Sequence, residues 1–237
     1  MAKPSHRPPV AGPPLIRTLA RLGHPLLSSD SPALPAALGN WVDWNRAVAL
    51  ARALDGALPP APDVAATLTR EAVEEECARA HSAHRDAVHA LVEALDDSLD
   101  AAELQRRHAT LQRGQLTSTG RLRGRLRDLL AQGDAQCARL AEIDAVMEQA
   151  LAPREFRLLD ALGARLAAHA KATLAPADPE TVDDTAPGTA SSPSAPWPAA
   201  LRDDVRELLL AELDLRFHPI EGLLAALHPH RAGPHAA

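Results

Sequence analysis

The chain has very few aromatic residues, with three Trp, two Phe and no Tyr among its 237 residues. Its hydrophobic content of 46% consists mainly of Ala, Leu and Val instead. Ala and Leu are strong helix formers, whereas the aromatic and β-branched residues that favour strands are scarce. This composition predicts an all-α protein.

Long apolar runs are also missing, so we expect no integral membrane segment, which would need about 20 apolar residues. Residues 1–13 contain prolines and basic residues but no apolar signal-peptide core, and we expect a disordered arm. Cys77 and Cys137 lie far apart in no disulfide framework, which predicts reduced thiols and a cytoplasmic protein. The net charge of −6 gives no overall attraction to nucleic acid or anionic lipid.

Breaker residues divide the chain into a multi-helix bundle over residues 14–175 and a C-terminal helical segment over residues 199–228. Between them, residues 176–198 contain six prolines and four acids but no base. Such a sequence cannot offset the entropy of ordering, so we predict a disordered Pro/Ala/Ser/Asp linker. We expect residues 229–237 to form a disordered tail.

Several helix starts are indicated by local signals. Aspartates precede four of the predicted helices, at Asp30, Asp63, Asp100 and Asp134. Glu103 follows the third of these aspartates by three residues, as in a capping box. Pro153 and Pro219 are each predicted to occupy the first position of a further helix, where proline is favoured.

Two of the three tryptophans, Trp41 and Trp44, lie three positions apart in an apolar helical stripe. We predict that they are core anchors. The alternative is an exposed hot spot for a partner, because Trp is enriched at such sites. Phe156 is predicted to be a third core anchor, at the start of a buried stripe that continues through Leu159, Leu162 and Leu166.

Three potential zinc ligands, Cys77, His81 and His84, share one helical face, and Glu74 lies one turn earlier. Ligands in a line form a poor tetrahedron, and a single zinc site usually draws ligands from a second element. We therefore favour a solvated polar face, predict no cofactor, and retain these four residues only as metal candidates.

Charge is segregated along the chain. Residues 71–103 contain ten acids and two arginines, whereas residues 105–127 contain seven arginines and no acid. We expect a helical hairpin to place the two blocks side by side, where they would pair. The alternative is a nucleic-acid-associated regulator that contacts phosphates through Arg106, Arg107, Arg113, Arg121, Arg123, Arg125 and Arg127.

No phosphate-binding glycine loop and no nucleophile elbow is present, so we predict a non-catalytic interaction protein. The C-terminal segment is too apolar to remain alone in water. We expect it to cap the bundle and also to bind a protein partner or a second copy of the chain, with fold-back alone as the alternative. The candidate partner-binding residues are Leu208, Leu209, Leu213, Phe217, Leu223 and Leu224.

Three stretches carry a resemblance to a known family: "LIRTLARL…WVDWNRAVALARAL", "LAEIDAVMEQALAPREFRLLDAL" and "LLLAELDLRFHPIEGLLAAL". Together they resemble an uncharacterised bacterial family that is defined only as a domain of unknown function. Genes of that family are expected to lie beside genes for a proton-channel-like inner-membrane protein and an OmpA-like protein. The resemblance implies a cytoplasmic accessory to an envelope-associated membrane complex, but no activity and no binding residues.

Overall fold

A computed structural model of the chain describes residues 13–23, 42–60, 69–95, 100–175 and 197–228. The described residues form no strand, and their helices are α1 (Pro14–Arg21), α3 (Trp44–Asp55), α4 (Arg70–Glu93), α5 (Ala101–Ala131), α6 (Ala135–Leu174) and α7 (Ala199–Leu227). The predicted all-α fold is therefore confirmed. The predicted arm, linker and tail lie almost entirely outside the described residues.

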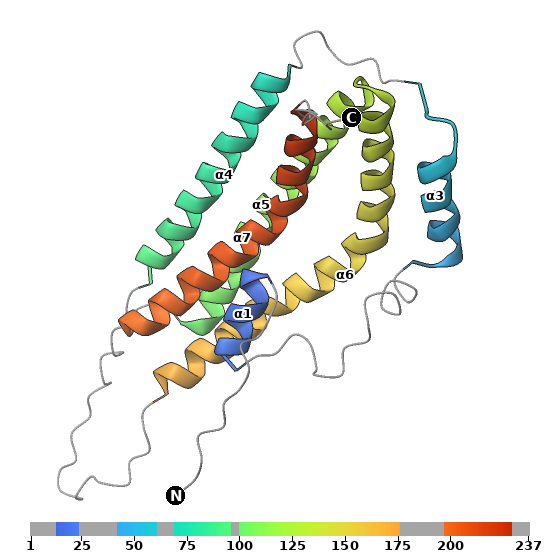
Figure 1. Cartoon of the computed structure of the whole chain (residues 1–237). Coiled ribbons are helices and arrows are strands. Elements are labelled where there is room, and N and C mark those ends of the chain that lie inside the picture. Colours follow the sequence, from blue (N-terminus) through green and yellow to red (C-terminus); the bar gives the residue numbers. More distant parts are fainter. Residues whose placement is uncertain (1–12, 24–41, 61–68, 96–99, 176–196, 229–237) are drawn as a thin grey trace, which may run out of the picture.

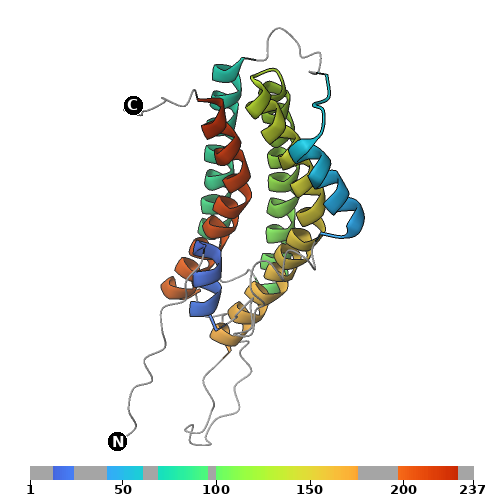
Figure 2. The same cartoon turned by 45° about the vertical axis from the view of Figure 1, so that its right-hand side comes forward.

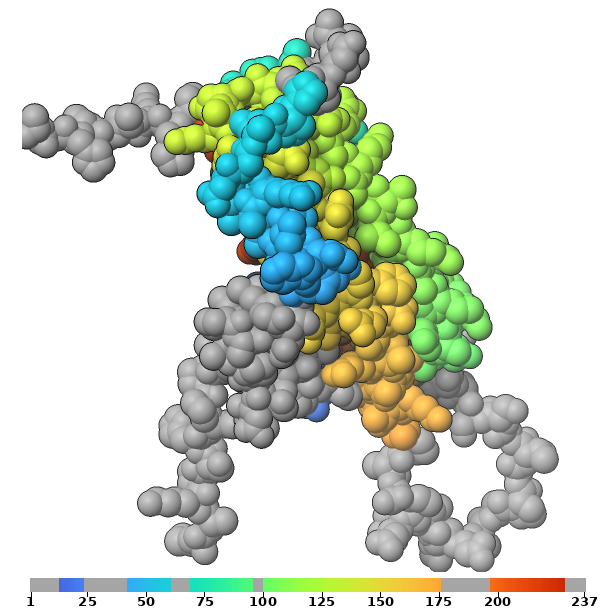
Figure 3. Space-filling view, turned by 90° about the vertical axis from the view of Figure 1, so that its right-hand side faces the viewer, coloured from blue at the N-terminus to red at the C-terminus, as the bar shows by residue number. Residues whose placement is uncertain are grey.

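The long helices α4, α5, α6 and α7 form the body of the protein (Figure 1). Helices α4, α5 and α7 run side by side, and Figure 2 shows α4 and α7 on one flank with α5 and α6 on the other. Helix α1 packs against α7, and α3 packs against the outer side of α6 (Figure 3). Helix α7 thus contacts α1, α4, α5 and α6.

Side-chain caps fix most of the helix starts. The predicted starts at Asp100 and Asp134 are confirmed, because the Asp100 carboxylate accepts the Glu103 N–H at 2.7 Å and Asp134 caps α6. Thr69 caps α4, and Asp43 caps α3. The predicted starts at Asp30 and Asp63 fall outside the described residues.

The predicted helix starts at Pro153 and Pro219 are wrong, since each proline lies inside a continuous helix, α6 or α7. A proline in a helix interior removes one backbone hydrogen bond and pushes the preceding turn aside. Packing of the residues on both sides outweighs that penalty, because tertiary contacts supply most of the stability of a protein helix. Figure 1 shows the resulting bend in α6.

The core consists of two apolar clusters along the length of the body. The first cluster joins α1, the end of α4, the start of α5, the second half of α6 and the first half of α7. Trp197, which the sequence placed in the linker, is only 4% exposed there. The second cluster joins the opposite ends of α4 and α5 to the start of α6 and the second half of α7. Helices α4, α5, α6 and α7 each contribute to both clusters, and α7 contributes the most buried residues to them.

The candidate partner-binding residues of the C-terminal segment are core residues in this structure. Five of them, Leu208, Leu209, Leu213, Phe217 and Leu223, are at most 3% exposed. Leu224 is partly buried against the second cluster. Helices α4 and α5 present apolar faces that cover this row, so the segment caps the bundle as predicted. Its additional role in binding a partner or a second copy stays a prediction.

Helix α3 packs against α6 with little burial of its own side chains. Ala53 is its one buried residue. The Arg139 guanidinium of α6 donates hydrogen bonds to the carbonyl oxygens of Ala53 (2.8 Å) and Gly56 (3.0 Å). A cation at this end of α3 also interacts favourably with the helix dipole.

Candidate docking site between α5, α6 and α7

A small hollow of about 80 Å³ lies where α5 meets the proline-containing parts of α6 and α7. We refer to it as the recess. Its lining residues are Leu116, Thr119, Gly120 and Arg123 from α5, Glu148, Ala152, Glu155 and Phe156 from α6, and Arg216, Pro219 and Ile220 from α7. Pro219 lines the recess directly, and the lining residue Ala152 immediately precedes Pro153.

Two large apolar side chains at the recess are exposed to solvent, Phe156 by 59% and Leu116 by 49%. The prediction that Phe156 is a core anchor is therefore wrong. Leu159, Leu162 and Leu166 are buried as predicted. Helical geometry explains the difference, because Phe156 falls at the edge of the face on which those three leucines lie.

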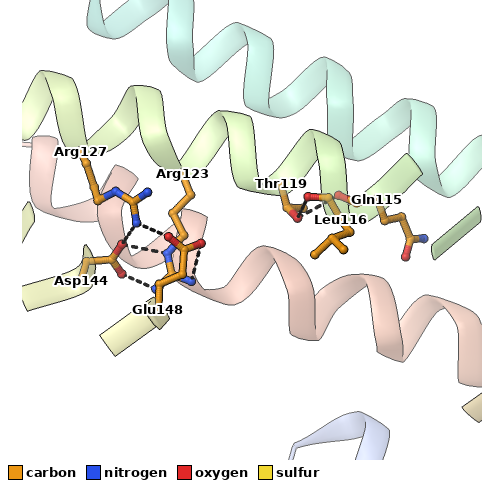
Figure 4. A network of polar contacts seen from close by, with 7 residues as sticks. All are labelled: Gln115, Leu116, Thr119, Arg123, Arg127, Asp144 and Glu148. Carbon is orange, nitrogen blue, oxygen red and sulfur yellow. Dashed lines mark hydrogen bonds and ion pairs between the residues drawn. The ribbon is translucent and has the colours of Figure 1, made fainter. Parts of the chain in front are cut away.

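An ion-pair cluster between α5 and α6 borders the recess (Figure 4). The Arg123 guanidinium donates two hydrogen bonds to Asp144, at 2.6 and 2.8 Å, and lies 3.5 Å from Glu148. Arg127 contacts both of these carboxylates. Burial disfavours the charged form of Arg123, but the hydrogen bond and charge of Asp144 outweigh it and raise the pKa.

These partners correct part of the predicted charge pairing. Arg121 and Arg125 do pair across the hairpin with Glu76 of α4, at 3.0 and 2.6 Å, as the sequence predicted. Arg123 and Arg127 instead pair with α6, because their positions on α5 face that helix.

The remaining arginines of the block lie near the start of α5. Arg106 and Arg107 share the carboxylate of Glu103 within the same helix. Arg113 donates to the Thr110 hydroxyl at 3.1 Å.

A buried polar layer lies between the two core clusters and shares Arg216 with the recess. The Glu212 carboxylate of α7 contacts His108 Nε2 and accepts from Gln112 Nε2, both at 2.7 Å, and accepts from Arg216 at 2.9 Å. Burial opposes the charged form of Glu212, but the hydrogen bond and charge of His108 and the charge of Arg216 outweigh it and lower the pKa. His108 and Glu212 are at most 1% exposed.

One amide beside this layer lacks partners. Gln115 is fully buried, and among the described residues neither its side-chain nitrogen nor its oxygen has a hydrogen-bond partner. Figure 4 shows its side chain directed away from the ion-pair cluster. The Thr119 hydroxyl, by contrast, donates to the Gln115 carbonyl oxygen at 2.8 Å.

The polar layer and the recess were not predicted from the sequence. A partial signal was present, because Glu212 and Arg216 interrupt the apolar run of α7 at a spacing of four, which suits an ion pair on one helical face. On α5, His108, Gln112 and Gln115 recur at helical spacings of four and three, in the stretch between the buried leucines Leu104 and Leu122.

The tryptophan pair has only one described member. Trp41 lies outside the described residues, whereas Trp44 is 81% exposed at the first position of α3. The prediction that Trp44 is a core anchor is therefore wrong. Trp44 is the first residue of α3, whereas the buried residue of this helix, Ala53, lies near its other end. Exposure favours the alternative interpretation of Trp44 as a contact for a partner.

The metal candidates lie within or beside the second core cluster. Cys77 is buried, and burial together with the charge of Glu76 raises the pKa of its thiol to about 11. The rings of His81 and His84 lie edge-on to Phe217, with centroids 4.7 and 6.4 Å away. Burial and the neighbouring His81 lower the pKa of His84.

Glu74, the fourth candidate, forms an ion pair with Arg70 of the same helix (3.4 Å). Within the described ranges, no three His, Cys, Asp or Glu residues gather as a metal would require. The described helices also include none that is long and apolar enough to cross a membrane.

Comparison with models of known protein families places the chain in a family. A family model described as "Protein of unknown function (DUF3348)" matches residues 1–229. The resemblance to a domain of unknown function is therefore confirmed. No curated protein and no solved structure matches the chain.

Proposed function

The chain belongs to the DUF3348 family, a family without an assigned function, and from its structure we propose that it is a non-catalytic protein. In this proposal, the protein docks a protein partner at the recess. The observation that carries this proposal is the exposure of Phe156 and Leu116 on either side of one hollow. Aromatic side chains at a hollow that a partner can fill are typical of binding hot spots.

The surroundings of the recess support protein docking. The ion-pair cluster and Glu155 form a polar border around the two apolar side chains, as in the rim of a protein interface. The charged groups of the polar layer and of the cluster are bound to one another rather than directed at a shared reactive position. This arrangement supports a binding role over a catalytic one.

Gly120 provides a way to close the recess without disturbing the fold. A Cβ added at Gly120 would meet nothing within 4 Å. Gly124, one turn further along α5, has the same open surroundings and does not line the recess. Gly120→Leu therefore fills the recess, and Gly124→Leu is a matched control on the same helix.

The experiment is affinity capture from cells that express the chain, including detergent-solubilised membranes, followed by mass spectrometry. We expect a partner that the wild-type protein and Gly124→Leu both capture, and that Phe156→Ala and Gly120→Leu both lose. Circular dichroism confirms that all variants remain folded. Capture of the same partners by all four proteins would refute docking at the recess.

Membrane fractions are included because the family resemblance implies an accessory to an envelope-associated membrane complex. We propose, on that ground, a cytoplasmic protein with a partner in the inner membrane. A partner found only in the soluble fraction would contradict this finer proposal and leave docking at the recess intact.

The alternative function is a nucleic-acid-associated regulator that uses the arginines of α5. Arg113, which has no carboxylate partner among the described ion pairs, is the observation in its favour. The other six arginines of the block each contact a carboxylate. We expect no appreciable binding of mixed-sequence DNA or RNA at physiological salt. Tight binding that falls steeply with salt would favour the alternative.

A further inference from the structure

A groove of about 560 Å³ runs between α4 and α5, on a side of the protein away from the recess. Its floor and its rim differ in chemistry. The floor is apolar, and the rim on α5 is basic. The residues used below are Ala87 and Leu91 of α4 and Arg106, Arg107, Leu111 and Gly114 of α5.

The groove is wide because small residues line it. Ala87 faces the space from α4, and a Cβ added at Gly114 of α5 would meet nothing within 4 Å. Leu91 and Leu111 supply larger apolar side chains to the floor. There is therefore room for side chains from a partner to enter between the two helices.

The charge at the rim is positive. Arg106 and Arg107 both pair with Glu103, at 2.7 and 2.8 Å, and Glu103 is the one acid among the described lining residues. Two cations therefore share one carboxylate. The remaining titratable lining residue, His84, has its pKa lowered by burial, which favours the neutral ring. This groove is thus locally basic on a chain whose net charge is −6.

We propose that the groove binds an amphipathic α-helix of a partner protein, with its apolar face on the floor and acidic residues against Arg106 and Arg107. A groove with an apolar floor is the kind of site that binds the apolar face of an amphipathic helix. The α5 side extends from Glu103 to Gly114. That length corresponds to about 16 Å, or three turns of a partner helix.

This groove is independent of the recess because the two sites use opposite faces of α5. Arg107, Leu111 and Gly114 lie on one flank of the buried face, whereas Leu116 and Arg123 lie on the other flank. The inference thus goes beyond the proposed function. A protein with both sites could hold two partners at once.

The experiment pans a display library of helix-forming peptides, each about 16 residues long to cover three turns and two ends, against the full chain. We expect enriched peptides to carry apolar residues at helical spacing and Asp or Glu on the flanks of that face. Synthetic copies are then titrated by fluorescence anisotropy.

Gly114→Leu fills the groove with a residue of higher helix propensity. Affinity should fall about tenfold or more on Gly114→Leu and on the double variant Arg106→Gln with Arg107→Gln. Gly124→Leu is the matched control, and Phe156→Ala tests independence from the recess. Both should bind the peptides as the wild type does.

The proposal is overturned if no peptide is enriched, if enriched peptides lack acidic residues, or if they bind Gly114→Leu as tightly as the wild type. Binding of the protein to vesicles that contain phosphatidylserine is measured as a further comparison. Binding to these vesicles that depends on Arg106 and Arg107, without peptide binding, would assign the groove to lipid headgroups and also overturn the proposal. None of these results depends on whether a partner docks at Phe156.

Discussion

At the scale of the single residue, a buried carboxylate is stable only where neighbours supply the hydrogen bonds that water would otherwise provide. Glu212 has contacts of this kind with His108, Gln112 and Arg216. The three neighbours come from both α5 and α7. This one side chain therefore links two helices at the level where the apolar core is interrupted.

Glu212→Gln should lower the free energy of unfolding by about 3–5 kcal/mol at neutral pH, because it leaves the largely buried Arg216 cation without its partner. Urea denaturation measures this loss. Glu221→Gln, at an exposed position of the same helix, should change the stability by less than about 0.5 kcal/mol. Equal effects of the two variants would contradict the role assigned to Glu212.

The same carboxylate predicts a dependence on pH. The pKa of Glu212 is lowered from its ordinary value of 4.5 in the folded protein. Its stabilising contribution is therefore complete above pH 4.5 and is lost as the pH falls through the lower folded value. The stability difference between the wild type and Glu212→Gln should narrow below pH 4.5 in urea titrations. A difference that stays constant into acid would contradict this sign.

Gln115 and Gln112 form a second matched pair at this scale. Gln115→Leu should raise the free energy of unfolding by about 1–3 kcal/mol, because it removes a buried amide that has no hydrogen-bond partner among the described residues. Gln112→Leu should lower it, because that amide donates to the Leu159 carbonyl oxygen and to Glu212. Chemical denaturation of the two variants measures whether each free energy of unfolding rises or falls.

At the scale of the element, the sequence predicted the features that depend on residues close together in the chain. It missed the features that depend on contacts between distant residues. The starts of α5 and α6 were predicted because their caps lie within three residues of the helix. The continuation of α6 through Pro153 and of α7 through Pro219 was not predicted, because packing from other helices decides whether a proline ends a helix. The recess could not be predicted from the sequence for the same reason, because Leu116, Phe156 and Pro219 are neighbours only in the folded chain.

Glycines within helices give a prediction at this scale. Gly124→Ala should raise the free energy of unfolding by roughly 0.8–1 kcal/mol, because the site is open and Ala is the better helix former. Gly163→Ala should raise the free energy of unfolding by less than this, or lower it, because the added Cβ would lie 3.2 Å from Nδ1 of the buried His108. Thermal or urea unfolding of the two variants provides the comparison, and an equal gain would contradict close packing at Gly163.

At the scale of the whole molecule, the position of α7 makes the C-terminal segment a part of the core. The sequence separated residues 199–228 from the bundle by a linker. In the structure, eleven residues of α7 are buried, and nine of them belong to the two core clusters. The apolar row that suggested an external partner is covered by the chain itself.

A chain that ends at Ala175 should therefore fail to fold cooperatively, because α4 and α5 lose an apolar helix that packs against both of them. Circular dichroism on heating should show a broad, weak transition instead of a sharp one. Addition of a peptide that spans residues 197–228 should restore helicity and the sharp transition. A truncated chain with a wild-type melt would show that α7 is dispensable for the core.

The attachment of α3 has a consequence for how the protein opens. This helix contributes only Ala53 to the buried residues, and its end is fastened by the two hydrogen bonds from Arg139. Helices with so little burial open locally at a lower free energy than the global value. Backbone amides of α3 should therefore exchange their hydrogens with solvent while those of α5 remain protected. The protein would then behave as a stable body with one helix that detaches and returns, and its surface beneath α3 would be exposed intermittently.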